Sequence, residues 1–291
     1  MRRNRPACFD KERVEKMIEL PEGIVLAGQC RAALAGKTVE KVLPPSAPHK
    51  FCWFQGDPAD YHAALADRTV EGAESFGIYV ELSFTGGVRL CVNDGVNLRL
   101  LAPGKPAPAK YQLLIRFTDA SALVFTVAMY GGIICHRGDY DNEYYRKSRQ
   151  SLSPLDPAYG RVCFERIFEG EKPGLSAKAL LASGQRIPGL GNGVLQDILW
   201  TAGVHPKRGI GTLGEPEHAA LFAAVRTVLA EMAAQGGRET ERDLFGNPGG
   251  YRGTLSKNTL GSGCPRCGGP IVKEIYLGGA VYFCPACQPL K

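Results

Sequence analysis

The chain has 291 residues, of which 44% are hydrophobic and 22% are charged, a balance typical of globular proteins. This length allows two or three domains of about 100–200 residues each, and a formal net charge of +6 permits an anionic partner without requiring one. The longest apolar stretch, around residues 122–135, is shorter than the ~20 residues that span a membrane. Residues 1–16 are charged and precede no apolar signal region, so the sequence predicts a cytoplasmic protein.

A helix is predicted over residues 20–34, where apolar side chains recur at helical spacing and Gly36 ends the pattern. From residue 38 to residue 130 the pattern changes to alternating strands separated by Gly, Asp and Pro turns. One strand is expected in segment 74–84, with five apolar side chains on a single face: Phe76, Ile78, Val80, Leu82 and Phe84. This region is therefore predicted to be an antiparallel β-domain, either a sandwich or a barrel.

The polar stretch at residues 137–157 resembles an interdomain linker. Its basic and aromatic side chains suit the wall of a DNA cleft and a solvated linker equally well. They are Arg137, Tyr140, Tyr144, Tyr145, Arg146, Lys147 and Arg149. After this stretch the period is helical, and we expect helices at residues 158–169, 176–183, 192–202 and 215–235, the last with an apolar stripe typical of a core-facing helix.

Four of the ten cysteines lie together near the C-terminus. Cys264 and Cys267 form one C-x-x-C pair, Cys284 and Cys287 form another, and the spacer has room for two strands with a turn at Gly278–Gly279. Four thiolates at this spacing suit a tetrahedral site with no open position for catalysis, so we predict one structural zinc ion. Two disulfides are the alternative, which a cytoplasmic location disfavours, and the remaining cysteines are interpreted as reduced thiols.

Residues 184–206, GQRIPGLGNGVLQDILWTAGVHP, contain a glycine-rich loop. Its glycines match neither the G-x-G-x-x-G dinucleotide loop nor the Walker loop. We expect instead a tight turn between two helices, with Asn192 as the N-cap of the second. The amides around Gly191 and Gly193 would then lie at the positive end of a helix and could bind a phosphate oxygen, whereas a turn with no ligand is the alternative.

Taken in order, MIELPE (residues 17–22), the β-region, QRIPGLGNGVLQDIL and the CPRCG…YFCPACQ ribbon resemble the formamidopyrimidine-DNA glycosylase / endonuclease VIII family over about residues 17–288. The resemblance implies a multidomain α+β fold and a base-excision-repair glycosylase and AP lyase that binds damaged or abasic double-stranded DNA as a monomer. The implied parts are an extension (1–16), an N-terminal β-sandwich domain (17–145), a linker (146–157), a helix-two-turn-helix DNA-binding domain (158–262) and a four-cysteine zinc finger (263–291).

The same resemblance assigns the site residues. In the family an N-terminal proline amine attacks the sugar C1′ and forms a Schiff base, and the adjacent glutamate moves protons. Glu19 matches that catalytic glutamate, Glu22 matches a second acidic site residue, and Asn192, between Gly191 and Gly193, matches the asparagine that binds a DNA phosphate. Residues 11–16 are rich in amino acids with purine-rich codons, as a ribosome-binding site read in frame would be. This favours translation from Met17.

Three departures from the family pattern concern the reaction itself. Ile18 stands where the proline belongs, and a nitrogen inside a chain is an amide that cannot form an imine. Ile78 stands where the family has a lesion-site lysine. Gly278–Gly279 replaces a glycine–arginine pair, although glycine cannot make the bidentate arginine contact to a phosphate. The sequence therefore predicts a DNA-binding family member whose standard lyase chemistry is impaired.

Three functions stay open on the sequence alone. The first is a working glycosylase/AP lyase with another nucleophile, for which Lys50 is one candidate; Cys135–His136 is a weaker one, because adjacent strand residues point to opposite faces. The second is a non-catalytic protein that binds damaged DNA. The third is a scaffold that uses the ribbon for protein contact, which the retained Asn192 loop disfavours.

Overall fold

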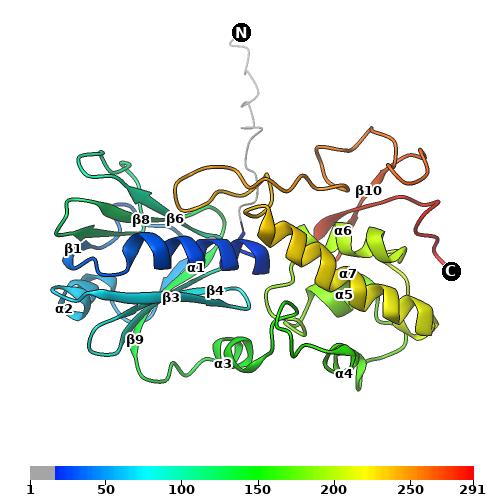
Figure 1. The fold of residues 1–291 in the computed structure, drawn as a ribbon, viewed down its shortest axis with the longest axis horizontal. Helices are drawn as coiled ribbons and strands as arrows, with labels where there is room; N and C mark the ends of the chain where they lie inside the picture. The colour runs from blue at the N-terminus through cyan, green and yellow to red at the C-terminus, as the bar shows by residue number, and fades with distance from the viewer. Residues whose placement is uncertain (1–16) are drawn as a thin grey trace, which may run out of the picture.

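The computed structural model describes residues 17–291, which form two lobes lying side by side and joined along one edge by the segment that carries α3 (Figure 1). The predicted extension at residues 1–16, and with it the prediction about the translation start, lies outside the described residues. None of the helices in residues 17–291 has the length and apolar character needed to cross a membrane.

The N-terminal lobe contains two sheets with α1 (Leu20–Leu34) packed against β3 and β4. One sheet has the order β1-β7-β8-β6 and the other β2-β9-β5-β4-β3, so the predicted β-sandwich is confirmed. All neighbouring strands are antiparallel except β2 and β9. The bounds are β1 (Val39–Leu43), β2 (Cys52–Phe54), β3 (Val70–Phe76), β4 (Tyr79–Phe84), β5 (Val88–Asn93), β6 (Val96–Leu101), β7 (Leu113–Phe117), β8 (Ala122–Val127) and β9 (Gly131–Arg137), with η1 (Pro58–Asp60) and α2 (Tyr61–Leu65) after β2.

Segment 74–84 is a hairpin and not the single strand that its alternation predicted. β3 ends at Phe76, Gly77 turns the chain with a φ of +55°, and β4 begins at Tyr79. The apolar side chains after the turn face the main core, whereas Phe76 and Ile78 pack in a separate cluster. The prediction of one shared face was therefore wrong for these two residues, because the apolar alternation continues through a turn.

The segment expected to be a linker contains a helix, α3 (Glu143–Gln150), that packs on the sheet. The Tyr145 hydroxyl donates to Glu81 Oε2 at 2.6 Å, and Arg149 Nη2 donates to Glu81 Oε1 at 2.6 Å. Burial favours the neutral form of Glu81, but the nearby His136 ring and the Tyr145 hydroxyl outweigh it and lower the pKa of Glu81 to about 2. Part of the basic and aromatic strip is thus fixed against β4.

The second lobe contains the predicted helices around one apolar core. They are α4 (Arg161–Glu165) followed by η2 (Arg166–Phe168), α5 (Ala177–Ala182), α6 (Asn192–Ala202) and α7 (Glu215–Ala234). A short 3-10 helix that was not predicted, η3 (Ile210–Thr212), precedes α7. The apolar stripe of α7 is buried except for Phe222, which is half-buried against the same core. Gly203, with a φ of +69°, ends α6 in the left-handed conformation that glycine adopts without strain.

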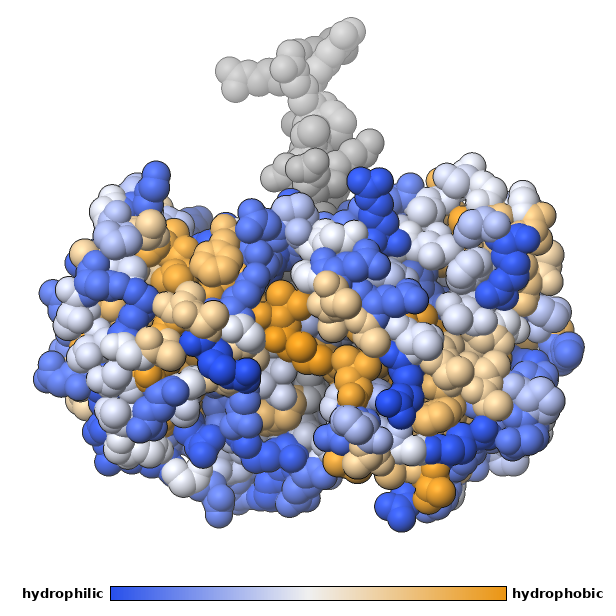
Figure 2. Space-filling model, in the orientation of Figure 1, coloured by the Kyte–Doolittle hydropathy of each residue, from blue (hydrophilic) through white to orange (hydrophobic). Residues whose placement is uncertain are grey.

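The C-terminal hairpin, β10 (Val272–Tyr276) and β11 (Gly279–Phe283), packs on α6. Its turn is at Leu277 and Gly278, which both have positive φ, and not at Gly278–Gly279 as predicted. Gly279 instead pairs with Tyr276 as the first residue of β11. Figure 2 shows hydrophobic side chains gathered across the middle of one face, over the region where α1 and α7 meet in Figure 1, with hydrophilic side chains on both flanks.

Candidate active site and metal site

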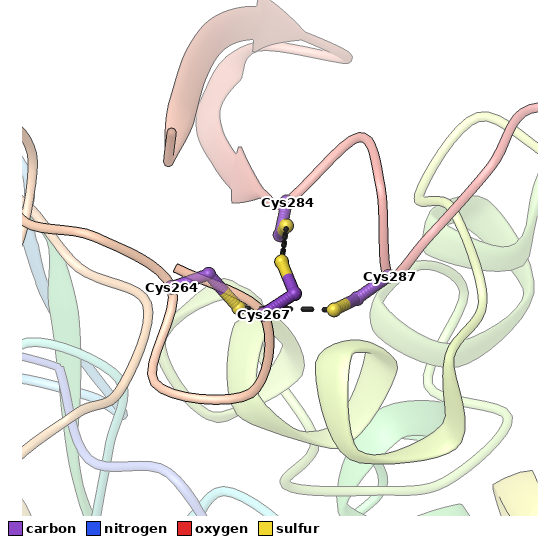
Figure 3. Close-up of side chains that lie close together, drawn as sticks. All are labelled: Cys264, Cys267, Cys284 and Cys287. Carbon is purple, nitrogen blue, oxygen red and sulfur yellow. Dashed lines mark hydrogen bonds between the residues drawn. The ribbon is translucent and has the colours of Figure 1, made fainter. Parts of the chain in front are cut away.

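The four C-terminal cysteines meet in one place. Cys264 and Cys267 come from the turn before β10, Cys284 and Cys287 follow β11, and their sulfurs lie within 4.8 Å of one another (Figure 3). The Sγ atoms are 3.8 Å apart for Cys264 and Cys287 and 3.5 Å apart for Cys267 and Cys284. A tetrahedron with Zn–S bonds of about 2.3 Å has edges of similar length, whereas a disulfide needs about 2.05 Å. The cluster can hold a metal ion, and within residues 17–291 its cysteines are free thiols, so the two-disulfide alternative is wrong.

Neighbouring N–H groups point at these sulfurs. The indole Nε1 of Trp200 donates to Cys264 Sγ at 3.4 Å, and the Gly269 amide donates to Cys267 Sγ at 3.4 Å. Burial disfavours the Cys264 thiolate, but the indole and backbone amides outweigh it and lower the pKa of Cys264. Such outer hydrogen bonds stabilise thiolates as metal ligands.

Glu19 joins the start of α1 to the start of α6. Its Oε1 accepts a hydrogen bond from the Gly193 amide at 2.8 Å, and its Oε2 accepts one from the Val194 amide at 2.9 Å. A carboxylate is favoured at a helix N-terminus by the helix dipole and the unpaired amides there. The predicted N-cap was therefore wrong, since Gly191 occupies that position and Asn192 is the first residue of α6.

Gly191 and Gly193, on either side of Asn192, leave room for the Glu19 carboxyl group. A Cβ at Gly191 would lie 2.7 Å from the Glu19 carboxyl carbon, and a Cβ at Gly193 would collide with Arg238 and lie 2.8 Å from Glu19 Oε1. The Gly193 amide, which the sequence suggested for a phosphate, is engaged by Glu19 in this structure. The roles of Gly191 and Gly193 in binding DNA stay predictions.

Glu22 and Glu19 share a buried guanidinium. Arg238 donates from Nε to Glu22 Oε1 at 2.9 Å and from Nη2 to Glu22 Oε2 at 2.8 Å, and its Nη1 lies 3.5 Å from Glu19 Oε1. Glu241, also buried, accepts a hydrogen bond from the Met17 nitrogen at 3.2 Å. Glu241 also interacts electrostatically with Arg238, so three carboxyl groups share the charge of one guanidinium.

Burial sets the protonation of this cluster. It raises the pKa of Glu19, although Arg238 opposes the shift, and it raises the pKa of Glu241 to about 7. At least one carboxyl can thus hold a proton near neutral pH, as a general acid must. Sequence reasoning missed Arg238 and Glu241, and the only local signal was the charged run RETE after two glycines.

No nucleophilic amine is present at position 18 of the described chain. The Ile18 nitrogen is a peptide amide that donates to the Asp94 carbonyl at 2.8 Å, and its side chain is buried in the main core. The other nucleophile candidates lack support from their surroundings. Lys50 is exposed, with Nζ 5.2 Å from the ring centre of Phe51, and is not the desolvated lysine that a Schiff base favours.

Cys135 and His136 point to opposite faces of β9, as their adjacency predicted. Cys135 packs against the main core, whereas His136 Nε2 lies 3.5 Å from Glu81 Oε2. Burial raises the pKa of the Cys135 thiol to about 11, which disfavours the thiolate. They do not form a catalytic pair.

Asn192 lies beside the ribbon hairpin, formed by β10 and β11, and beside the buried side chain of Lys178. Its Nδ2 donates to the Ala280 carbonyl at 3.0 Å. A Cβ at Gly279 would lie 3.4 Å from both Asn192 Nδ2 and Lys178 Nζ. Lys178, on α5, donates to the Tyr276 carbonyl at 2.6 Å, and burial lowers its pKa. Sequence reasoning missed Lys178 because a single lysine in a helix carries no pattern.

A cavity of about 420 Å³ lies beside Asn192. Gly193, Arg238 and Gly279 are also among its lining residues. It lies where α6, the loop after α7 and the ribbon hairpin meet. Elements of the helical lobe and of the ribbon thus surround a space next to the acidic cluster.

Comparison with known proteins gives a consistent set of relatives. No protein-family model matches the sequence. The formamidopyrimidine-DNA glycosylase of Burkholderia thailandensis is 31% identical, over 94% of this chain and 100% of that protein. Among solved structures, the MutM (Fpg) protein of Thermus thermophilus has a TM-score of 0.77 at 25% identity, covering 94% of this chain and 99% of that one. Lactococcus lactis Fpg bound to DNA with an abasic site has a TM-score of 0.81 at 21% identity, covering 93% and 99%.

Proposed function

Because the chain belongs to the formamidopyrimidine-DNA glycosylase family, we propose that it binds double-stranded DNA at damaged or abasic positions, along the junction of its two lobes. The observation that carries the proposal is the position of Glu19, which is held against the start of α6 one residue from Asn192. The MIELPE and QRIPGLGN segments, which both contribute to the family resemblance, are thus in direct contact. The Lactococcus relative, of the same fold, was solved with DNA that contains an abasic site.

The DNA-binding part of the proposal rests on Asn192 and its neighbours. The carboxamide of Asn192 can donate to a phosphate oxygen, and Lys178 brings a cation to the same edge of the hairpin. Lys178 supplies positive charge close to the position where the family has an arginine and this chain has Gly279. We propose that one chain binds as a monomer, since both lobes contribute to this site.

The chemical part of the proposal is that the standard lyase reaction is impaired. An imine requires a free amine, whereas the Ile18 nitrogen is a peptide amide that already donates to Asp94. Glu19 and Glu241 can still exchange protons, so acid–base groups are retained without the amine they would serve. The second candidate is a non-catalytic protein that binds damaged DNA. The hydrogen bond from the Ile18 amide to the Asp94 carbonyl favours this candidate as well.

We propose Zn²⁺ as the ion held by the four cysteines, in a structural role. Four thiolates at tetrahedral spacing suit zinc and leave no position for substrate. The ion would hold the hairpin that contacts Asn192. Metal analysis of the purified protein should give one zinc per chain, and loss of the metal after Cys287→Ser but not after Cys163→Ser would support the assignment.

The test of function uses labelled duplex with one abasic site. We expect a complex in a gel shift whose affinity falls steeply with salt, as phosphate contacts require, and no covalent adduct after borohydride. Absence of binding at low salt would overturn the proposal of DNA binding. A trapped adduct would overturn the proposal of impaired chemistry, and mapping it would identify the nucleophile.

A further inference from the structure

A second cavity, of about 300 Å³, lies on the helical lobe beside the chain that connects α3 to α4. One part of its wall is residues 150–152, at the end of α3 and just after it, and the rest comes from residues 159–167 and 186–188. Figure 1 shows the α3–α4 connection along the edge where the two lobes are joined. The cavity shares no lining residue with the 420 Å³ cavity beside Asn192. Its volume is at the lower end of the range of about 300–1,000 Å³ that is usual for small-molecule sites.

Tyr159 lines this cavity and has a buried hydroxyl group without a partner. The residue is 5% exposed, and its hydroxyl forms no hydrogen bond within residues 17–291. Burial raises the pKa of Tyr159 to about 12, so the hydroxyl keeps its proton at neutral pH. An unsatisfied buried polar group costs free energy, and most such groups in folded proteins have a partner. The Tyr159 hydroxyl is therefore available to bond to a molecule in the cavity.

Arg166 gives the cavity a positive charge that nothing nearby compensates. Two arginines line the cavity, and none of its described lining residues is acidic. Arg186 is paired with Glu171, with Nε 2.5 Å from Oε1, and its Nη1 donates to the Ser183 carbonyl at 2.8 Å. The exposed guanidinium of Arg166 has no ion-pair or hydrogen-bond partner in the part of the chain that the structure describes. A single guanidinium suits a single carboxylate, which it can bind through two parallel hydrogen bonds.

The rest of the lining is largely apolar, with aliphatic side chains from Leu152, Ile167, Ile187 and Pro188. Ile167 and Ile187 are buried, whereas Leu152 is 44% exposed, so aliphatic surface extends from the core of the helical lobe to solvent. An organic molecule would remove apolar surface from water against these side chains, at about 25 cal/mol per Å². A bare inorganic anion would gain nothing from them. The lining therefore favours an anion with an apolar body.

We propose that this cavity binds a small monocarboxylate that has an apolar body and a hydroxyl group at its far end. The carboxylate would pair with the exposed Arg166, the body would pack on Ile167 and Ile187, and the hydroxyl would bond to the buried hydroxyl of Tyr159. Because Leu152 belongs to the chain after α3, the bound molecule would contact this connection and the helical lobe together. The proposal goes beyond DNA binding and does not depend on it.

The experiment compares three small molecules by isothermal titration calorimetry with the full chain at neutral pH. They are 3-(4-hydroxyphenyl)propanoate, its uncharged amide, and 3-phenylpropanoate, which lacks the hydroxyl. We expect the hydroxylated acid to bind about tenfold more tightly than the amide and about fivefold more tightly than the acid without a hydroxyl. Arg166→Gln should remove the difference between acid and amide. Tyr159→Phe should remove only the difference that the hydroxyl makes.

Arg252→Gln is the matched control, because Arg252 is an exposed arginine next to Tyr251 of the helical core and does not line the cavity. It should keep both differences. Equal losses after Arg166→Gln and Arg252→Gln would overturn the proposal, as would equal binding of the three molecules or no binding of the hydroxylated acid at millimolar concentration. Each of these results would leave the proposed DNA binding standing.

The free protein provides an independent check. Tyr159→Phe should not lower its melting temperature, because the hydroxyl has no partner to lose. A melting temperature well below that of wild type would mean that the hydroxyl is already satisfied in the folded protein, and the reason for a polar ligand group at this position would fail.

Discussion

Arg238 holds Glu22 in a buried bidentate ion pair that ties the loop after α7 to the first turn of α1, with Nε 2.9 Å from Oε1 and Nη2 2.8 Å from Oε2. The two residues are 216 positions apart in the chain. The same guanidinium lies 3.5 Å from Glu19, so one cation compensates two carboxylates at the lobe junction. Burying these charges has a desolvation cost, and the structure tolerates it only while every partner is present.

Removing the cation should therefore destabilise the protein strongly. We expect Arg238→Met to lower the free energy of unfolding by about 3–5 kcal/mol, because it leaves buried carboxylates without their counter-charge. Urea unfolding followed by circular dichroism measures the change. Arg242→Met, four residues on and exposed, is the matched control and should stay within about 0.5 kcal/mol of wild type. Equal small effects of the two variants would mean that the buried pair contributes nothing specific.

Glu241 should make stability depend on pH near neutrality. Its pKa in the folded protein is about 7, above the ordinary value of 4.5, so between these values the folded state binds more protons than the unfolded state. This contribution is complete below about pH 4.5 and is lost as pH rises through 7. We expect the wild-type protein to lose up to about 3 kcal/mol of stability from this group across that window.

Glu241→Gln tests this pH dependence, since glutamine stays neutral and can still accept from the Met17 nitrogen. The variant should show a smaller fall in unfolding free energy between pH 5 and pH 8 than wild type. Urea titrations at the two pH values give the comparison. An identical fall in both proteins would show that another group titrates in this range.

The features that sequence predicted well have local causes. Helix α1 begins and ends where its apolar spacing and Gly36 indicated, and the four cysteines meet because each C-x-x-C turn brings two sulfurs together. The acidic cluster could not be predicted in this way. Arg238 and Glu241 lie in a loop without periodicity, and their partners are more than 200 positions away. The same distance explains the incorrect cap on α6, since Glu19 reaches those amides from 174 positions away.

The docking of α3 should depend on one hydroxyl group. Tyr145→Phe removes the donor to Glu81, a carboxylate that is 1% exposed. We expect a loss of about 1–3 kcal/mol in unfolding free energy and faster amide exchange in α3. Tyr144→Phe, at the exposed neighbouring position, should change neither quantity measurably. Equal exchange rates in both variants would show that Arg149 alone holds the helix on β4.

The ribbon hairpin should gain DNA affinity when an arginine is restored at position 279. Gly279 has ordinary strand geometry, and a Cβ there would lie 3.4 Å from Asn192 Nδ2 and Lys178 Nζ, so a side chain fits after small shifts of two flexible groups. We expect Gly279→Arg to add one phosphate contact. The plot of log affinity for the abasic duplex against log salt should then become steeper by about 0.9. Ala102→Arg adds the same charge in an exposed loop of the other lobe and should leave that slope unchanged.

If both variants steepen the slope equally, the gain comes from net charge and the hairpin does not face the DNA backbone. A steeper slope for Gly279→Arg alone would mean that this edge, with Asn192 and Lys178, contacts phosphate even though the chain has glycine where its family has arginine.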